Sequence, residues 1–381
     1  MNVSGLYDPI DGPRGGSLHA AKRTVARTLS ANWLAPAWAP LARERVAFIT
    51  LHRFAEPDLG LFGHDRELFR RGLERLRHDG YALMSVAEAA RRLTEGLGFA
   101  KRTVVFTMDD GYRGALENSA DLFAEYDCPL TVFLTSGFID GTTWFWWDQV
   151  EHACLASGQP RLRMEWDGRV IDLDLGSRRA KITTLLDVCA WCKTLPDEEK
   201  WRFIRALADA AGVELTNEAP EAYAPLSWDE ARTFESRGVI AFGPHTVTHP
   251  ILPRTTDAQA AWEITESWAR LRAELRSPVD VFSFPNGAYG ERELRLLAGT
   301  SLRAAVTTVP AYTGARGVAL SGVTRFELPR FSYPEAPDPL CLIASGFRSV
   351  EMALGRWRGR TAPTAEAPTA VAAGAVDMVA R

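Results

Sequence analysis

The chain has 381 residues, 46% hydrophobic residues and a formal net charge of -4, which describes a soluble globular protein with enough apolar side chains for a sizeable core. Its charge gives no indication of nucleic-acid binding. Five cysteines, an odd number without regular spacing, argue against a disulfide framework and favour a reducing compartment. We therefore expect one large domain with an insertion.

Residues 1–45 are predicted to form an N-terminal extension with one amphipathic helix. The apolar stripe of this helix consists of Leu18, Ala21, Val25, Leu29 and Trp33. Cationic residues flank the stripe, and no acidic residue occurs from residue 12 to residue 43. Such a helix can lie in an anionic membrane surface or pack against its own protein, and the sequence leaves both interpretations open.

The same extension gives no convincing secretory signal. Arg27 and Asn32 interrupt its apolar stretch, which lies far from Met1, and no apolar run approaches the ~18 residues of a membrane-spanning helix. The expected location is therefore cytoplasmic, with peripheral association at the inner face of the membrane as the further hypothesis.

From residue 46 onward, apolar strand patterns alternate with helical patterns, which predicts a parallel sheet, open or closed. Strands are expected near residues 46, 103, 129, 239, 281 and 304, with a seventh near 323. The predicted barrel domain spans residues 46–358, and the Ala, Thr and Pro rich segment 359–381 is predicted to be disordered.

Residues 141–226 interrupt the alternation and are predicted to form an inserted subdomain with a hairpin from 162 to 175 and helices after it. Trp146 and Trp147 lie in an aromatic cluster that can stack on sugar rings or fill a core. Cys189 and Cys192 form a C-x-x-C pattern on a helical apolar stripe, which favours a packed helix face over a redox or zinc role.

The central motif is the run 103–107, which leads into Asp109, Asp110 and a glycine. Taken alone, an Asp-Gly after a strand is usually only a turn. A second stretch supplies His245 and His249 after another apolar run, and a carboxylate with two imidazoles is a set of metal ligands.

The loop between the two histidines cannot stay extended. Four residues at about 3.3 Å each would hold the histidines some 13 Å apart, whereas both nitrogens of one zinc site lie about 2.0 Å from the ion. Pro250 disfavours helical geometry at His249, so a coiled turn rather than a long helix is expected to present the pair.

Further polar residues follow other predicted strands, and the carboxyl ends of parallel strands meet at one face of a barrel. The residues expected to converge there are His52, Asp109, Asp110, His245, His249 and Asn286. Arg330 is expected at the same rim. This convergence favours a functional role for His52 over the structural role that a lone histidine usually has.

The segments 107–111, 245–249 and 284–287 resemble the successive motifs of the polysaccharide deacetylases, carbohydrate esterase family 4 with its NodB homology domain. The resemblance spans residues 46–335. It implies a distorted (β/α)7 barrel, a TIM-like fold, and one divalent metal held by Asp110, His245 and His249. Zn²⁺ is the expected ion, with Ni²⁺, Co²⁺ and Mn²⁺ as alternatives.

Within this family, Asp109 corresponds to the catalytic base, and His52 resembles the general acid of the permuted branch that includes the poly-N-acetylglucosamine deacetylases. Two positions depart from the pattern: Met108 replaces the usual aromatic residue, and Ser283 replaces an arginine that orients the base. We expect Arg330 to take over that role. Asn286, Trp146 and Trp147 are the candidate substrate-binding residues.

The resulting prediction is a metal-dependent hydrolase that removes the N-acetyl group from a sugar in a polysaccharide, lipid-linked glycan or related glycoconjugate, acting on a carbon–nitrogen bond of a linear amide. A metal polarises any carbonyl, so an O-acetyl ester or a cyclic amide, the latter hydrolysed without metal, are alternative substrates. A non-catalytic glycan-binding barrel is a further alternative, but no expected ligand or base is missing from the sequence.

Overall fold

The computed structural model describes residues 28–29, 44–59, 61–99, 102–314 and 324–349. Apart from residues 28–29, the predicted N-terminal helix lies outside these residues, and so does the C-terminal tail. The described chain forms two compact units, one made of residues 44–140 and 224–349 and the other of residues 141–223. Among the described helices, none combines the length and apolar character that crossing a membrane requires.

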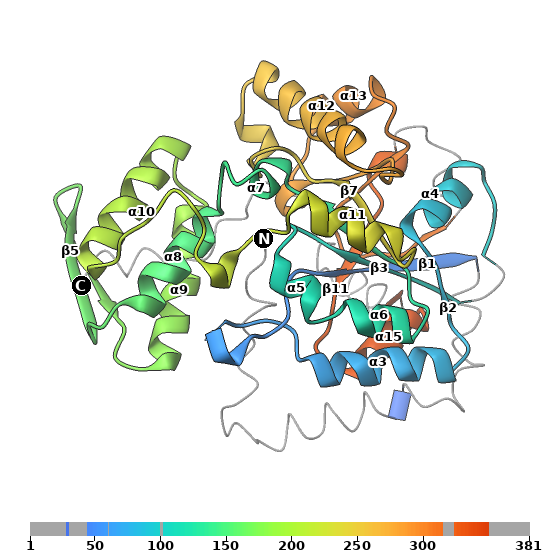
Figure 1. Cartoon of the computed structure of the whole chain (residues 1–381), viewed down its shortest axis with the longest axis horizontal. Helices are drawn as coiled ribbons and strands as arrows, with labels where there is room; N and C mark the ends of the chain where they lie inside the picture. Colours follow the sequence, from blue (N-terminus) through green and yellow to red (C-terminus); the bar gives the residue numbers. More distant parts are fainter. Residues whose placement is uncertain (1–27, 30–43, 60, 100–101, 315–323, 350–381) are drawn as a thin grey trace. The chain divides into compact units, whose positions relative to one another are not determined.

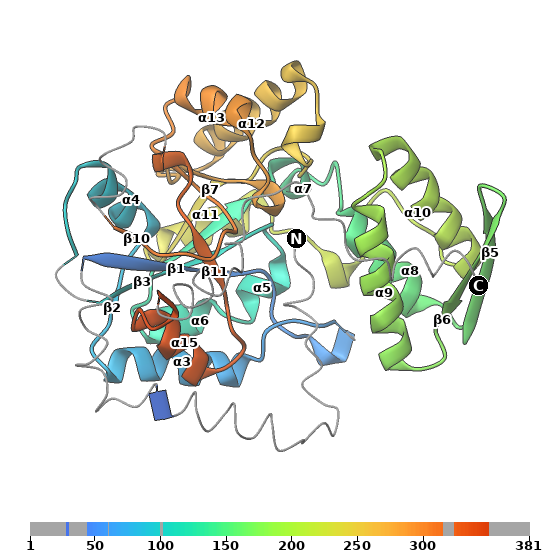
Figure 2. The ribbon, with the colours of Figure 1, turned by 180° about the vertical axis from the view of Figure 1, so that it is seen from behind.

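The first unit is built on parallel strands (Figures 1 and 2). Four of them pair in the order β1, β3, β4 and β7, with bounds Arg45–Leu51, Thr103–Met108, Leu130–Leu134 and Ile240–Pro244. Two more, β8 (Val281–Ser283) and β9 (Ala304–Val306), pair with each other. The seventh, β11 (Arg330–Ser332), is parallel to β1.

Hydrogen bonds outside these ladders close the ring. Val279 N donates to Phe242 O at 2.7 Å, which joins the start of β8 to β7. Leu328 forms a parallel bridge with Val306 of β9 just before the chain enters β11. The seven parallel strands thus follow one another around a (β/α)7 barrel, as the sequence predicted. Two short strands, β2 (Ala82–Leu83) and β10 (Thr313–Gly314), pair with the first residues of β3 and β1.

The strands of the barrel are apolar along their length because helices cover the sheet and leave no face of it in water. Every residue of β3 is buried, as are all of β1 after Arg45. In both views α12 and α13 lie together on one side of the strands, and α3 and α15 on the other (Figures 1 and 2). The longer helices of this unit are α3 (Arg66–His78), α4 (Val86–Thr94), α11 (Trp228–Ser236), α12 (Asp257–Glu274), α13 (Glu291–Ala298) and α15 (Pro337–Ala344).

Shorter elements connect these parts. They are α5 (Arg113–Glu117), α6 (Ala120–Glu125), α7 (Ser136–Ile139) and the 3-10 turns η3 (Pro57–Leu59), η5 (Leu252–Arg254), η6 (Pro285–Gly287) and η7 (Thr324–Phe326). Helix α11 begins with a capping box: Ser227 Oγ accepts from Glu230 N, and Glu230 Oε2 accepts from Ser227 N.

The second unit contains the predicted hairpin, formed by β5 (Arg161–Trp166) and β6 (Arg169–Asp174). Its other elements are α8 (Trp146–Ala156), α9 (Arg178–Cys192), α10 (Asp197–Ala211) and η4 (Glu221–Tyr223). Cys189 and Cys192 lie on the buried face of α9, and both thiols are free, so the packed-face interpretation of the C-x-x-C pattern is confirmed.

The prediction of a seventh strand near residue 323 is wrong. Residues 324–326 form η7, and the strand is β11, which begins at Arg330. A three-residue strand that opens with an arginine lacks the apolar run by which the other strands are identified. The arginine is therefore part of the barrel wall, with none of its surface exposed.

Candidate active site

The end of β3 carries Asp109 and Asp110 in a tightly constrained turn. Asp110 has φ 81° and Gly111 has φ 101°, a region that costs a residue with a side chain free energy. A Cβ on Gly111 would lie 2.8 Å from Leu134 Cδ2 and 2.9 Å from Ile139 Cδ1, so a side chain there would have to displace both in addition to adopting this φ. Backbone hydrogen bonds from Asp109 N to Leu51 O and from Thr135 N to Asp110 O fix the turn between β1 and β4.

His245 follows β7 and is held in one orientation. Its ring Nδ1 lies 2.7 Å from Ser283 O, a carbonyl that can only accept, so Nδ1 carries the proton and Nε2 presents its lone pair. The four residues after it form a coil, with φ 67° at Thr246 and φ 57° at His249. The prediction of a coiled turn between the two histidines is therefore confirmed.

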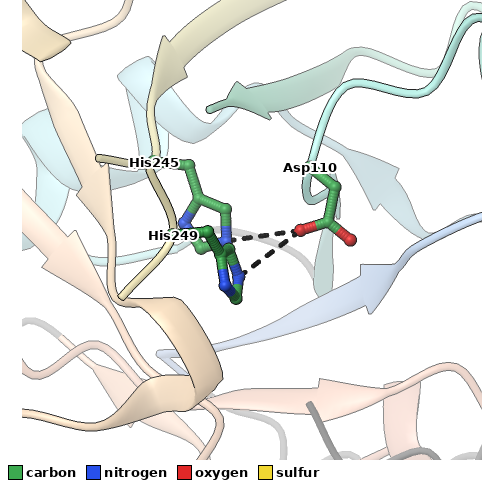
Figure 3. A group of neighbouring side chains, drawn as sticks. All are labelled: Asp110, His245 and His249. Atoms are coloured by element: carbon green, nitrogen blue, oxygen red, sulfur yellow. Dashed lines mark ion pairs between the residues drawn. The ribbon is translucent and has the colours of Figure 1, made fainter. Parts of the chain in front are cut away.

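Figure 3 shows Asp110, His245 and His249 pointing toward one another. Asp110 Oδ1 lies 3.7 Å from His245 Nε2 and 3.6 Å from His249 Nε2, which is too long for hydrogen bonds. Two ligand atoms bound at about 2.0–2.2 Å to one tetrahedral ion lie about 3.3–3.6 Å apart. The ligand atoms of the group all lie within 4.8 Å of one another, and all three residues are buried. The donor set and spacing fit one divalent ion.

The protonation states of the histidines also suit metal binding. Burial lowers the pKa of His245, with Asp109 opposing the change in part, and burial lowers the pKa of His249 well below its ordinary value. Both imidazoles are therefore neutral at pH 7, and the neutral ring is the form that binds metal.

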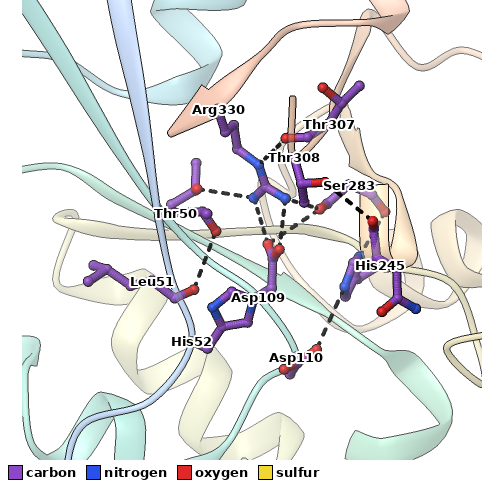
Figure 4. A network of polar contacts seen from close by, with 12 residues as sticks. Thr50, Leu51, His52, Asp109, Asp110, His245, Ser283, Thr307, Thr308 and Arg330 are labelled. Atoms are coloured by element: carbon purple, nitrogen blue, oxygen red, sulfur yellow. Dashed lines mark hydrogen bonds and ion pairs between the residues drawn. The ribbon is translucent and has the colours of Figure 1, made fainter. Parts of the chain in front are cut away.

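Asp109 forms a two-pronged ion pair with Arg330 in the barrel interior (Figure 4). Arg330 Nη1 lies 2.8 Å from Asp109 Oδ1, and Nη2 lies 2.8 Å from Oδ2. Burial alone would raise the pKa of Asp109, but the charge and hydrogen bonds of Arg330 outweigh it and hold the pKa well below its usual range. The arginine thus occupies the orienting position for which the sequence proposed it.

The same arginine is itself fully satisfied. Its Nε donates to Thr307 O at 2.9 Å, and its terminal nitrogens also reach Thr107 Oγ1 and Ser283 Oγ, each at 3.1 Å. Ser283 Oγ lies 3.3 Å from Asp109 Oδ1. Ser283 therefore contacts both the candidate base and, through its carbonyl, His245. The sequence showed only that an arginine was missing here, so this double contact was not predicted.

His52 leaves the end of β1 beside Asp109 and Asp110 (Figure 4). Burial lowers its pKa to about 3, although Asp109 opposes the change. Behind it lies a pair that the sequence gave no signal for: His64 Nδ1 is 2.5 Å from Glu335 Oε1, and His64 Nε2 is 3.4 Å from His52 N. His64 follows no strand of the barrel, and Glu335 follows β11, which the sequence did not locate, so strand-end reasoning did not select them.

The candidate substrate-binding residues lie in two different units. Asn286 is in η6 after β8, partly exposed, with φ 55° and its carbonyl accepting from Thr308 Oγ1. Trp146 and Trp147 belong to the second unit and are 9% and 5% exposed. Trp147 stacks on Phe145 at 4.4 Å between ring centroids, so the two indoles contribute to the packing of their own unit and a role in sugar binding stays a prediction.

Comparison with known proteins agrees with this site. Residues 199–305 match the model of the family described as polysaccharide deacetylase. The matched segment includes His245 and His249. The match over this part of the chain agrees with the family resemblance that the sequence motifs indicate. The assignment to the permuted branch stays a prediction.

Solved structures also align with this chain, at low sequence identity. The deacetylase PplD of Streptococcus pyogenes, solved in complex with acetate, is 16% identical and aligns with a TM-score of 0.50 over 79% of this chain and 98% of its own. IcaB of Ammonifex degensii is 14% identical, with a TM-score of 0.49 over 80% of this chain and 97% of its own. The first similarity supports the barrel fold. No curated protein sequence matches the chain.

Proposed function

We propose that the protein is a metal-dependent hydrolase that removes the N-acetyl group from an N-acetylated sugar in a polysaccharide, a lipid-linked glycan or a related glycoconjugate. The observation that carries the proposal is the buried cluster of Asp110, His245 and His249, whose ligand atoms face one another next to the arginine-bound carboxylate of Asp109. A divalent ion held by this cluster, Zn²⁺ most readily, supplies a Lewis acid that polarises the acetamide carbonyl and acidifies a water molecule.

The protein's own groups account for the proton transfers. Asp109 accepts a proton from the attacking water, and Arg330 holds the carboxylate in one orientation through a hydrogen bond to each oxygen. Because Arg330 lowers the pKa of this carboxyl, Asp109 holds the proton only briefly and passes it on readily.

His52 is the proposed donor to the leaving amine nitrogen. With a pKa of about 3 it is neutral at rest at pH 7, so the proton reaches it in the course of the reaction. The charge of Asp109 raises the pKa of His52, which favours transfer to the imidazole as the carboxylate is regenerated. The amine then leaves protonated, and the acetate oxygen comes from water.

Three alternative functions are compatible with the chemistry of the site. An O-acetyl ester presents the same carbonyl with a better leaving group, so it would depend less on His52. A metal-free cyclic amide hydrolase would turn over without an ion, and a glycan-binding barrel would not turn over at all. Measuring how turnover depends on metal and on His52 distinguishes these three alternatives from the proposed deacetylase.

We further propose that the protein acts in the cytoplasm, peripherally at the inner face of the membrane. The support comes from the amphipathic stripe and the acid-free segment of residues 12–43, because each cation near an anionic surface contributes about 1 kcal/mol. The free thiols of all five cysteines agree with a reducing compartment. This location would bring the enzyme next to lipid-linked glycans under assembly.

Metal analysis of four variants tests the proposed site. The purified wild-type protein is expected to hold about one divalent ion, and Asp110→Ala, His245→Ala and His249→Ala are each expected to lose it. Asp109→Asn should retain the ion and lose turnover, because Asp109 is not among the ligands. Metal bound equally well by all of these variants would rule out the assigned ligand set.

A further inference from the structure

A buried carboxylate outside the ligand set holds the loop between the two histidines. Glu263 lies in the middle of α12 with none of its surface exposed. Its Oε2 accepts hydrogen bonds from Val247 N at 2.8 Å and from Thr248 N at 2.9 Å. Its Oε1 accepts from Thr248 Oγ1 at 2.5 Å. All three donors belong to the segment that separates His245 from His249.

The loop needs such an acceptor because it is neither helix nor strand. Thr246 and His249 adopt left-handed φ values, so the backbone N–H groups between them cannot enter a regular ladder. A buried N–H without an acceptor costs about 1–3 kcal/mol, and here one carboxylate oxygen accepts from two of them. Glu263 therefore offsets the cost of the conformation that brings the two imidazoles together.

The opposite side of the loop is held as well. Ser136 N and Gly137 N, at the start of α7, donate to the carbonyls of Thr246 and Val247 at 3.0 and 2.9 Å. His249 N donates to Thr246 Oγ1 at 3.0 Å. The loop is thus held between α7 and α12. Of these two supports, only the one from α12 depends on a single side chain, since α7 contributes backbone groups that substitution does not remove.

We propose that Glu263 is a positioning residue of the metal site, which sets the spacing of His245 and His249 through Val247 and Thr248. The inference rests on the proposed function, since it takes these histidines as metal ligands. Glu263 touches neither imidazole, so it acts only through the loop. Removing a group that orients metal ligands without itself binding the metal typically weakens metal affinity by about 10- to 100-fold.

The test measures zinc affinity by competition with a chromophoric chelator, together with amide hydrogen exchange at Val247 and Thr248 in the metal-free protein. Glu263→Ala is expected to bind zinc about 10- to 100-fold more weakly and to exchange both amides faster. Glu263→Gln, which keeps one acceptor oxygen, should fall between it and the wild type. Thr248→Val removes one of the three hydrogen bonds and should lose on the order of 5-fold in affinity, which keeps the test available if Glu263→Ala does not fold.

Glu293→Ala is the matched control. Glu293 in α13 is 1% exposed and accepts hydrogen bonds from Gly290 N and Arg292 Nε, and none of its hydrogen bonds within the described residues reaches the 245–249 loop. It should lose stability comparably and bind zinc like the wild type. Wild-type zinc affinity in Glu263→Ala and Thr248→Val, or equal weakening in Glu293→Ala, would overturn the inference. A wild-type protein that binds no zinc would instead overturn the metal site itself, and with it the inference.

Discussion

Replacing Arg330 with methionine should destabilise the barrel strongly and in a pH-dependent way. The side chain is fully buried, and its two bonds of 2.8 Å are the only cationic contacts to Asp109 among the hydrogen bonds and ion pairs of the described residues. Methionine fills most of the space but leaves a charged carboxylate buried without its partner. Removing one member of a buried ion pair costs about 3–5 kcal/mol, so we expect a loss of that size at pH 7.

The pH dependence follows from the pKa of Asp109 in the two proteins. In the wild type the folded pKa lies below the unfolded value, so the carboxylate contributes stability above pH ~4 that is lost as the pH falls. Without Arg330, burial raises the folded pKa above the unfolded value. The charged carboxylate then costs stability as the pH rises, so the difference between variant and wild type grows from pH ~4 to pH 7.

The assay is urea unfolding of both proteins, stripped of metal with a chelator, at pH 4.5 and pH 7. Asp109→Asn is the partner variant. In the Arg330→Met background it removes the unpaired charge and should recover part of the lost stability, which gives a coupling free energy of several kcal/mol. A loss below about 1 kcal/mol that does not change with pH would refute the argument that Arg330 compensates a buried charge.

Three further predictions follow from the sequence and the site. His52→Ala should fold and retain metal but lose at least about 10²-fold in deacetylation rate, with activated aryl acetates affected least; equal losses for aryl acetates and acetamides would exclude an acid role. Burial raises the pKa of the Cys154, Cys192 and Cys341 thiols to about 12. The rate of their alkylation at pH 8 should therefore be roughly 10³-fold lower in the folded protein than in urea, and it should rise with pH. Rapid labelling of the native protein would contradict the burial of these thiols. The full chain should sediment with anionic vesicles at low salt, and a chain beginning at Arg43 should not. An insoluble truncated chain would instead favour docking of the N-terminal helix on the barrel. Recovery of a processed chain from the periplasm would refute the cytoplasmic location.

The strand ends could be predicted because the barrel imposes them. Continuous apolar runs identified six strands, and parallel strands present their carboxyl ends at one face, so Asp110, His245 and the carboxylate of Asp109 could be placed together from the sequence alone. The seventh strand was not located by this reasoning because it begins with Arg330 and so lacks the apolar run that identified the other short strands.

The supporting contacts could not be predicted in the same way. Ser283 holds His245 from 38 residues away, and Glu263 lies on a helix where its spacing indicates only a polar position. Such contacts depend on how a helix and a loop meet in three dimensions, and no local periodicity records that. They nevertheless determine whether the ligands converge, which is why Glu263 emerged only from the structure.

The central claim, a metal-dependent deacetylase, is tested most directly by acetate release from an N-acetylated sugar oligomer. The measurement compares the purified enzyme, the same enzyme after removal of metal, and the stripped enzyme after addition of about one equivalent of Zn²⁺. The account predicts that stripping abolishes acetate release and that zinc restores it in the wild type but not in Asp109→Asn. Full acetate release from the stripped enzyme would contradict it.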